Sequence, residues 1–98
     1  MAISKLTALS KGFTATWKKQ SYVTGYQLQY STSSKFTTKT TKTVKITKNT
    51  TVSKSITKLT TAKRYYVRIR SYKTTKISGK TYTVYSVWSK VKYVTTKK

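Results

Sequence analysis

The chain has 98 residues, of which 22 are Lys or Arg and none is Asp, Glu, His, Cys or Pro, so its formal net charge is +22 at pH 7. Average usage would give a soluble domain of this length about ten carboxylates, so their complete absence is not a sampling accident. The composition excludes disulfides and removes the usual groups for general acid–base catalysis and for zinc or calcium binding. We therefore expect a protein that is not an enzyme and that uses no metal and no cofactor.

The length predicts a single small domain spanning residues 1–98. No apolar run approaches the roughly 20 residues that cross a bilayer, so no membrane insertion is expected. Met1 stands directly before the first strand-like segment, which suggests a trimmed, recombinant chain. Like-charge repulsion favours a monomer.

Apolar residues alternate with polar ones along the whole chain, and nowhere do they keep helical spacing for two turns. This pattern predicts an all-β protein. The first clear strand follows Gly12 and places Phe13, Ala15 and Trp17 on one face. The next follows Gly25, with its apolar residues again at alternate positions: Tyr26, Leu28 and Tyr30.

Shorter strands are predicted around Val44 and Ile46 and, more weakly, over residues 52–59. The clearest amphipathic strand covers residues 65–72, with one face formed by Tyr65, Val67, Ile69 and Ser71. Residues 76–80 predict a hairpin turn, and one last strand is expected over residues 82–95. Seven short strands in one small domain are typical of an immunoglobulin-like β-sandwich. The predicted core comprises Phe13, Trp17, Tyr26, Leu28, Tyr30, Val67 and Ile69.

Several segments resemble the fibronectin type III family, and together they cover almost the full chain. Leu6-Thr7-Ala8, Gly12–Trp17 and Gly25–Ser31 are similar to its strands A, B and C. Leu59 followed by Tyr65 resembles its E–F corner, residues 65–70 its strand F, and residues 85–91 the start of strand G in bacterial surface proteins. The resemblance implies a seven-stranded sandwich from an extracellular or cell-surface family.

The same resemblance implies a tyrosine corner, in which the Tyr65 hydroxyl bonds back to backbone near Leu59, and makes Trp17 the core Trp of strand B. The chain departs from the family at residues 60–63, which read Thr-Thr-Ala-Lys where Pro and acidic residues are usual. We expect a less rigid corner, because Pro restricts the unfolded chain. The adhesive tripeptide of some fibronectin domains needs an Asp and is absent.

The arginines Arg64, Arg68 and Arg70 all fall in one predicted strand, whereas lysines occur throughout the chain. Arg68 and Arg70 share a face, and Trp88 should lie across from them on the neighbouring strand. We expect a cation–π ladder with a structural role, worth about 0.5–2 kcal/mol per contact. It resembles a single copy of the Trp-Ser motif of cytokine-receptor domains.

No lysine cluster stands out, so no specific partner is predicted. Such a charge still binds polyanions, including nucleic acid, heparin and anionic polymers, with little sequence selectivity and with strong salt dependence. The main hypothesis is a fibronectin type III scaffold that was designed or engineered without acidic residues, that is, positively supercharged. One alternative is a natural basic module of a bacterial cell-surface or wall-associated protein, serving as a spacer or anionic-polymer binder. A weaker alternative is a nucleic-acid-binding domain, which a lysine cluster on one face would favour.

Overall fold

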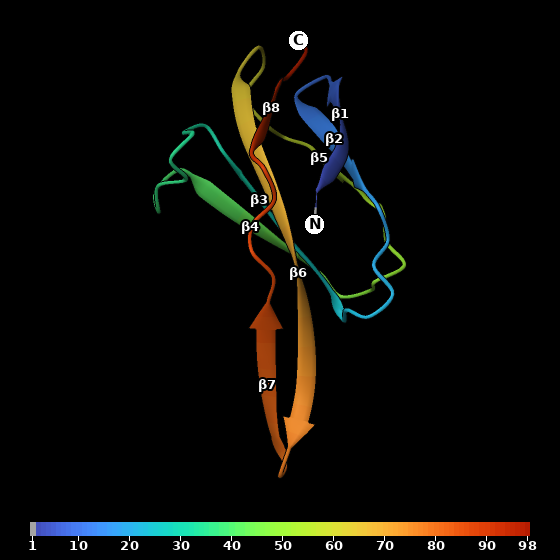
Figure 1. The fold of residues 1–98 in the computed structure, drawn as a ribbon. Helices are drawn as coiled ribbons and strands as arrows, with labels where there is room; N and C mark the ends of the chain where they lie inside the picture. The colour runs from blue at the N-terminus through green and yellow to red at the C-terminus, as the bar shows by residue number, and fades with distance from the viewer. Residues whose placement is uncertain (1) are drawn as a thin grey trace.

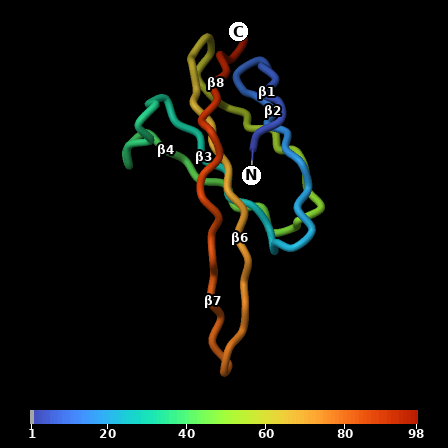
Figure 2. The backbone as a smooth tube through the Cα atoms, in the orientation of Figure 1, coloured from blue at the N-terminus to red at the C-terminus, as the bar shows by residue number. Residues whose placement is uncertain are grey.

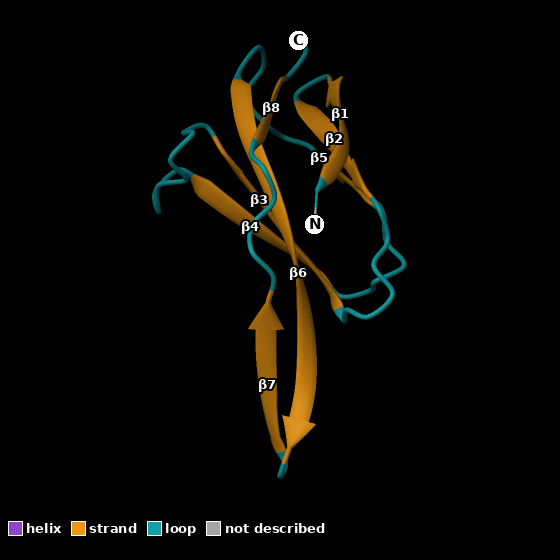
Figure 3. Ribbon diagram, in the orientation of Figure 1, coloured by secondary structure: helices purple, strands orange, loops and turns teal. Residues whose placement is uncertain are grey.

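The computed structural model describes residues 2–98 as two antiparallel β-sheets packed as a sandwich, with no helix among these residues (Figure 1; Figure 3). Within that range no helix is long and apolar enough to cross a membrane. The all-β prediction is therefore confirmed.

The smaller sheet has three strands in the order β1-β2-β5, with bounds Ile3–Leu9, Gly12–Trp17 and Ser53–Ile56. The larger sheet has five strands. Four follow the order β4-β3-β6-β7, and β8 also pairs with β6. Their bounds are β3 Gly25–Ser31, β4 Thr41–Ile46, β6 Arg64–Ile77, β7 Lys80–Tyr85 and β8 Lys92–Thr95.

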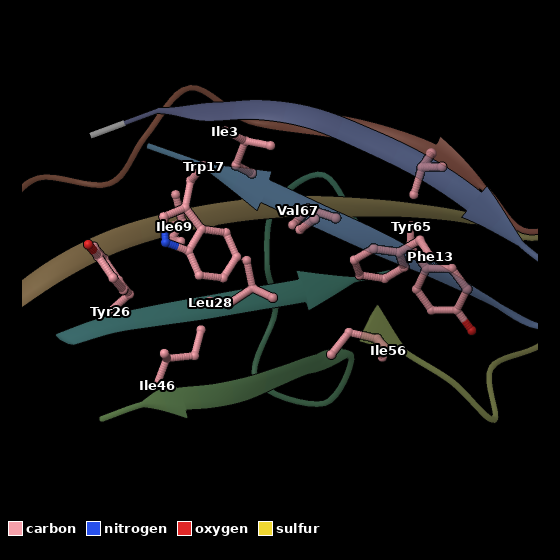
Figure 4. Packing of buried hydrophobic residues seen from close by; sticks show 12 residues of the cluster. Ile3, Phe13, Trp17, Tyr26, Leu28, Ile46, Ile56, Tyr65, Val67 and Ile69 are labelled. Atoms are coloured by element: carbon pink, nitrogen blue, oxygen red, sulfur yellow. The ribbon is translucent and has the colours of Figure 1, made fainter. Parts of the chain in front are cut away.

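The core lies between the two sheets and is built from the alternating residues of their strands (Figure 4). Alternation works because successive side chains of a strand point to opposite faces. Six of the seven predicted core residues are buried, and Tyr30 is partly buried against them. The rings of Trp17 and Tyr26 meet edge-on, 5.6 Å apart between centroids. Within residues 2–98, the Trp17 indole N–H is the buried side-chain polar group without a hydrogen-bond partner.

The prediction of one continuous last strand over residues 82–95 is wrong. Residues 2–98 form eight strands rather than seven, because the chain is irregular between β7 and β8. In this gap two serine hydroxyls replace backbone acceptors: Ser86 Oγ accepts from Ser71 N at 3.0 Å, and Ser89 Oγ accepts from Ile69 N at 3.0 Å. The amides of both serines donate to β6, so the segment stays attached without regular pairing.

Strand β6 runs well past the sandwich. Its last partner in β3 is Gly25, which faces Tyr72, and beyond that point it pairs with β7 alone. The two strands continue as a hairpin that projects from the body, seen clearly in the backbone trace (Figure 2). The predicted hairpin turn within residues 76–80 is confirmed at its end.

Candidate functional site

The cation–π ladder lies on the outer face of the five-stranded sheet, on the side of β6 away from the core. Arg68 and Arg70 alternate with the buried Val67 and Ile69, so both point outward. Trp88 belongs to the irregular segment between β7 and β8, not to a regular strand as predicted. The structure brings these three side chains together.

Each guanidinium of the ladder lies between two aromatic rings. Arg68 Cζ is 4.2 Å from the centroid of the Trp88 ring and 4.2 Å from that of Phe36. Arg70 Cζ is 4.2 Å from the Trp88 centroid and 3.8 Å from that of Tyr85. The cation–π ladder thus runs Phe36, Arg68, Trp88, Arg70, Tyr85. Such contacts contribute about 0.5–2 kcal/mol each, depending on how far they are desolvated.

Neutral amides accept the guanidinium hydrogen bonds. The pairing of β3 with β6 places Gln29 opposite Arg68 and Gln27 opposite Arg70. Gln29 Oε1 accepts from Arg68 Nε at 2.9 Å and from Arg68 Nη2 at 2.6 Å, and Gln27 Oε1 accepts from Arg70 Nε at 2.6 Å. Two like charges are therefore held side by side with no carboxylate between them.

Two serines position Trp88. Ser86 and Ser89 fix the chain on either side of it through the hydroxyl bonds to β6 described above. The backbone leaves and rejoins β6 between them, and the indole covers both guanidiniums. Hydropathy patterns carry no signal for this arrangement, although the sequence Ser-Val-Trp-Ser resembled the Trp-Ser motif.

Sequence reasoning missed four members of this site: Phe36, Tyr85, Gln27 and Gln29. The glutamines alternate with the core residues of β3, so the strand pattern already placed them on the outer face. Phe36 lies in a loop with a φ of 50°, which is uncommon for an aromatic residue and gives no sequence signal. Tyr72, which alternation along β6 places on the outer face with Arg68 and Arg70, is only 3 % exposed, because its ring meets Tyr85 and lies beneath Lys45.

The predicted tyrosine-corner residues also lie close together. The Thr60 amide donates to the Tyr65 hydroxyl at 3.1 Å, one residue beyond Leu59, which is partly buried against the core. At the same corner, Ala62 adopts a φ of 51°, a left-handed conformation that costs a residue with a Cβ about 1–2 kcal/mol.

The lysines are distributed along the whole described chain. Every lysine of the described chain is exposed, and they occur on both sheets and in the loops. No pocket is present in the surface formed by residues 2–98. No protein-family model matches the sequence, and no curated protein matches it either.

Two ionisable side chains have shifted pKa values. The pKa of Arg68 is lowered, first by burial and then by the charge of Arg70. The pKa of Tyr30 is raised, first by burial and then by Tyr65. Because the neutral form of Tyr30 is favoured in the fold, the domain keeps its full stability below the ordinary tyrosine pKa of about 10. That part of the stability is lost as pH rises through the raised pKa of the folded state and Tyr30 ionises. Neither shift changes stability in acid.

We expect the free energy of unfolding to change little between about pH 7 and about pH 2. Acid unfolding ordinarily requires carboxylates to take up protons or buried histidines to charge, and this chain has no Asp, Glu or His. Thermal melts followed by circular dichroism, at constant ionic strength with one anion, measure this directly. A clear loss of structure between about pH 5 and about pH 3 would contradict it.

Proposed function

We propose that the chain is a non-enzymatic, fibronectin type III-like scaffold whose acid-free surface binds polyanions through charge alone. The exposure of every described lysine, on strands of both sheets and in the loops, is the observation that carries this proposal. A polyanion gains affinity by releasing counterions wherever it meets Lys and Arg, and no pocket or readout element is required.

The strand arrangement supports the family. The three-stranded sheet β1-β2-β5 matches a sheet of strands A, B and E, and the order β4-β3-β6, continued by β7 and β8, matches C′, C, F and G. The Tyr65 bond at the turn before β6 is the contact that the tyrosine corner requires.

We further propose that the composition was imposed on an ordinary scaffold by design. The buried residues are those of a normal sandwich core, while the exposed positions carry mostly Lys, Thr and Ser, together with some Tyr, Val and Ile, and no acidic residue. Surface charge is abnormal and core patterning is not, as expected when surface positions alone are rewritten.

The test is affinity for heparin, duplex DNA and teichoic acid at about 50 mM and about 200 mM salt. A polyanion that engages about six cationic side chains should lose about 10³-fold in affinity over this range. We expect all three polymers to behave alike. A polymer that keeps its affinity at the higher salt concentration would instead indicate a selective site.

Two matched double variants locate the binding. One double variant combines Arg68→Thr with Arg70→Thr at the ladder, and the other combines Lys19→Thr with Lys54→Thr at exposed positions away from it; both lower the net charge by the same amount. If charge alone matters, both should weaken heparin binding to the same extent, within about twofold. A loss confined to the arginine variant, with its melt still cooperative, would contradict binding by overall charge.

A further inference from the structure

The projecting hairpin, residues 73–84, has an unpaired strand edge. On the β6 side its base is covered: Thr74 N donates to Thr24 Oγ1 at 2.9 Å, and Lys73 Nζ donates to the Tyr22 carbonyl at 3.1 Å. Strand β7 pairs with β6 on one side and has no strand on the other among residues 2–98, and all six of its residues are exposed. A free edge of this kind can pair with another strand.

The hairpin is held in one register by its turn. Ile77 pairs with Lys80, and the two residues between them have positive φ, 51° at Ser78 and 81° at Gly79, as in a type I′ turn. Residues that flank such a turn form a hydrogen-bonded pair, and pairing type alternates from there. Thr81, Thr83 and Tyr85 therefore direct their backbone N–H and C=O groups away from β6.

Nothing in β7 protects this edge in the usual ways. Natural edge strands are commonly blocked by proline, by a bulge or by charges along the strand. The pairing of β6 with β7 has no register shift, and Lys80 at the turn is the charged residue of β7. The hairpin also exposes large apolar side chains on the face that continues the core side of β6: Ile77 at 58 %, Tyr82 at 49 % and Val84 at 65 %.

Charge selects the occupant of the edge. Lys73, Lys76 and Lys80 lie on the hairpin, and the chain contains no acidic residue. A second copy of the chain has the same hairpin and the same net charge of +22, so electrostatic repulsion between the two copies disfavours pairing of their β7 edges. A segment with alternating acidic and apolar residues covers Tyr82 and Val84 with its apolar face, and its acidic face then lies on the side of Lys76, which pairs with Thr81 on the opposite face of the hairpin.

We propose that β7 is a docking edge for an extended acidic polypeptide segment, which adds as a further strand of the larger sheet. Main-chain hydrogen bonds to Thr81, Thr83 and Tyr85 hold the segment, and its acidic side chains favour it over neutral strands. This mode needs a defined backbone geometry, which separates it from the charge-driven polyanion binding proposed above.

The first test uses an acetylated octapeptide of alternating Glu and Val, and a control of the same sequence built from alternating D- and L-residues. The control keeps charge, composition and N–H groups but cannot form a regular ladder. We expect the all-L peptide to slow amide hydrogen exchange at Thr81, Thr83 and Tyr85 by about tenfold and the control to leave it unchanged. Equal binding of both peptides, or protection located on other strands, would overturn the proposal.

The second test uses Thr83→Pro, with Thr83→Ala as its matched control. Proline removes an N–H that points away from β6, and edge positions of this kind tolerate it. We expect about tenfold weaker binding of the all-L peptide to Thr83→Pro, and a change within about twofold for Thr83→Ala. Wild-type affinity in Thr83→Pro would overturn the docking edge. Heparin affinity should be the same in all three proteins, so a failure here is distinguishable from a failure of polyanion binding.

Discussion

Raising the salt concentration from about 0.02 M to about 0.5 M should raise the melting temperature of this domain by 10 °C or more. Two unit charges about 10 Å apart repel by about 0.4 kcal/mol in water before screening, and the net charge of +22 creates many such pairs. No Asp or Glu side chain offsets them. Their sum is comparable with a stability margin of about 5–15 kcal/mol.

Melts over a salt series, followed by circular dichroism or calorimetry, measure the effect. Sulfate should stabilise more than chloride at equal ionic strength, because it is also excluded from the protein surface. A matched variant with four exposed lysines replaced, at positions Lys19, Lys39, Lys54 and Lys90, should melt higher at low salt and respond less to added salt. A melting temperature independent of salt would contradict self-repulsion as the limit on this fold.

The substitution Gly25→Ala should destabilise the domain by about 3 kcal/mol, which lowers the melting temperature by about 10–20 °C. A Cβ at Gly25 would overlap the carbonyl oxygen of Ile46 and lie 2.9 Å from Tyr72 Oη. Both neighbours belong to strands paired with β3, so neither can move without disturbing the larger sheet.

Gly79→Ala is the matched control for this prediction. A Cβ at Gly79 has nothing within 4 Å, and its cost comes from the φ of +81° alone. We expect a loss of about 1–2 kcal/mol, confined to the hairpin turn. Chemical denaturation of both variants separates the two effects. Equal destabilisation would show that crowding at Gly25 is not the cause.

The sequence predicted the sandwich best where one strand face is buried. Tyr65, Val67 and Ile69 alternate with outward residues because the core admits only one face of β6. Alternation predicts no buried face beyond Tyr72, because the remainder of β6 does not pack against the core. The length of the projecting hairpin therefore left no trace in the hydrophobic pattern.

The ladder was predictable only in part. The sequence indicated that Arg68, Arg70 and Trp88 lie together, because arginines two apart on a strand share a face. Which glutamine faces which arginine depends on the β3–β6 register, and a single sequence does not fix that register. The irregular segment at residues 86–91 depends on serine hydroxyls that accept hydrogen bonds from backbone N–H groups of β6. A hydropathy pattern does not distinguish a serine that makes such a bond from one that does not.

The two glutamines that hold the arginines also bear on how this surface could change. Glutamate has nearly the same size and shape as glutamine, and the two codons differ by one nucleotide. A single base change at Gln27 or Gln29 would place a carboxylate directly on a guanidinium that is already aligned to receive it. In a chain with no acidic residue, these positions are where charge balance could return with the least rearrangement.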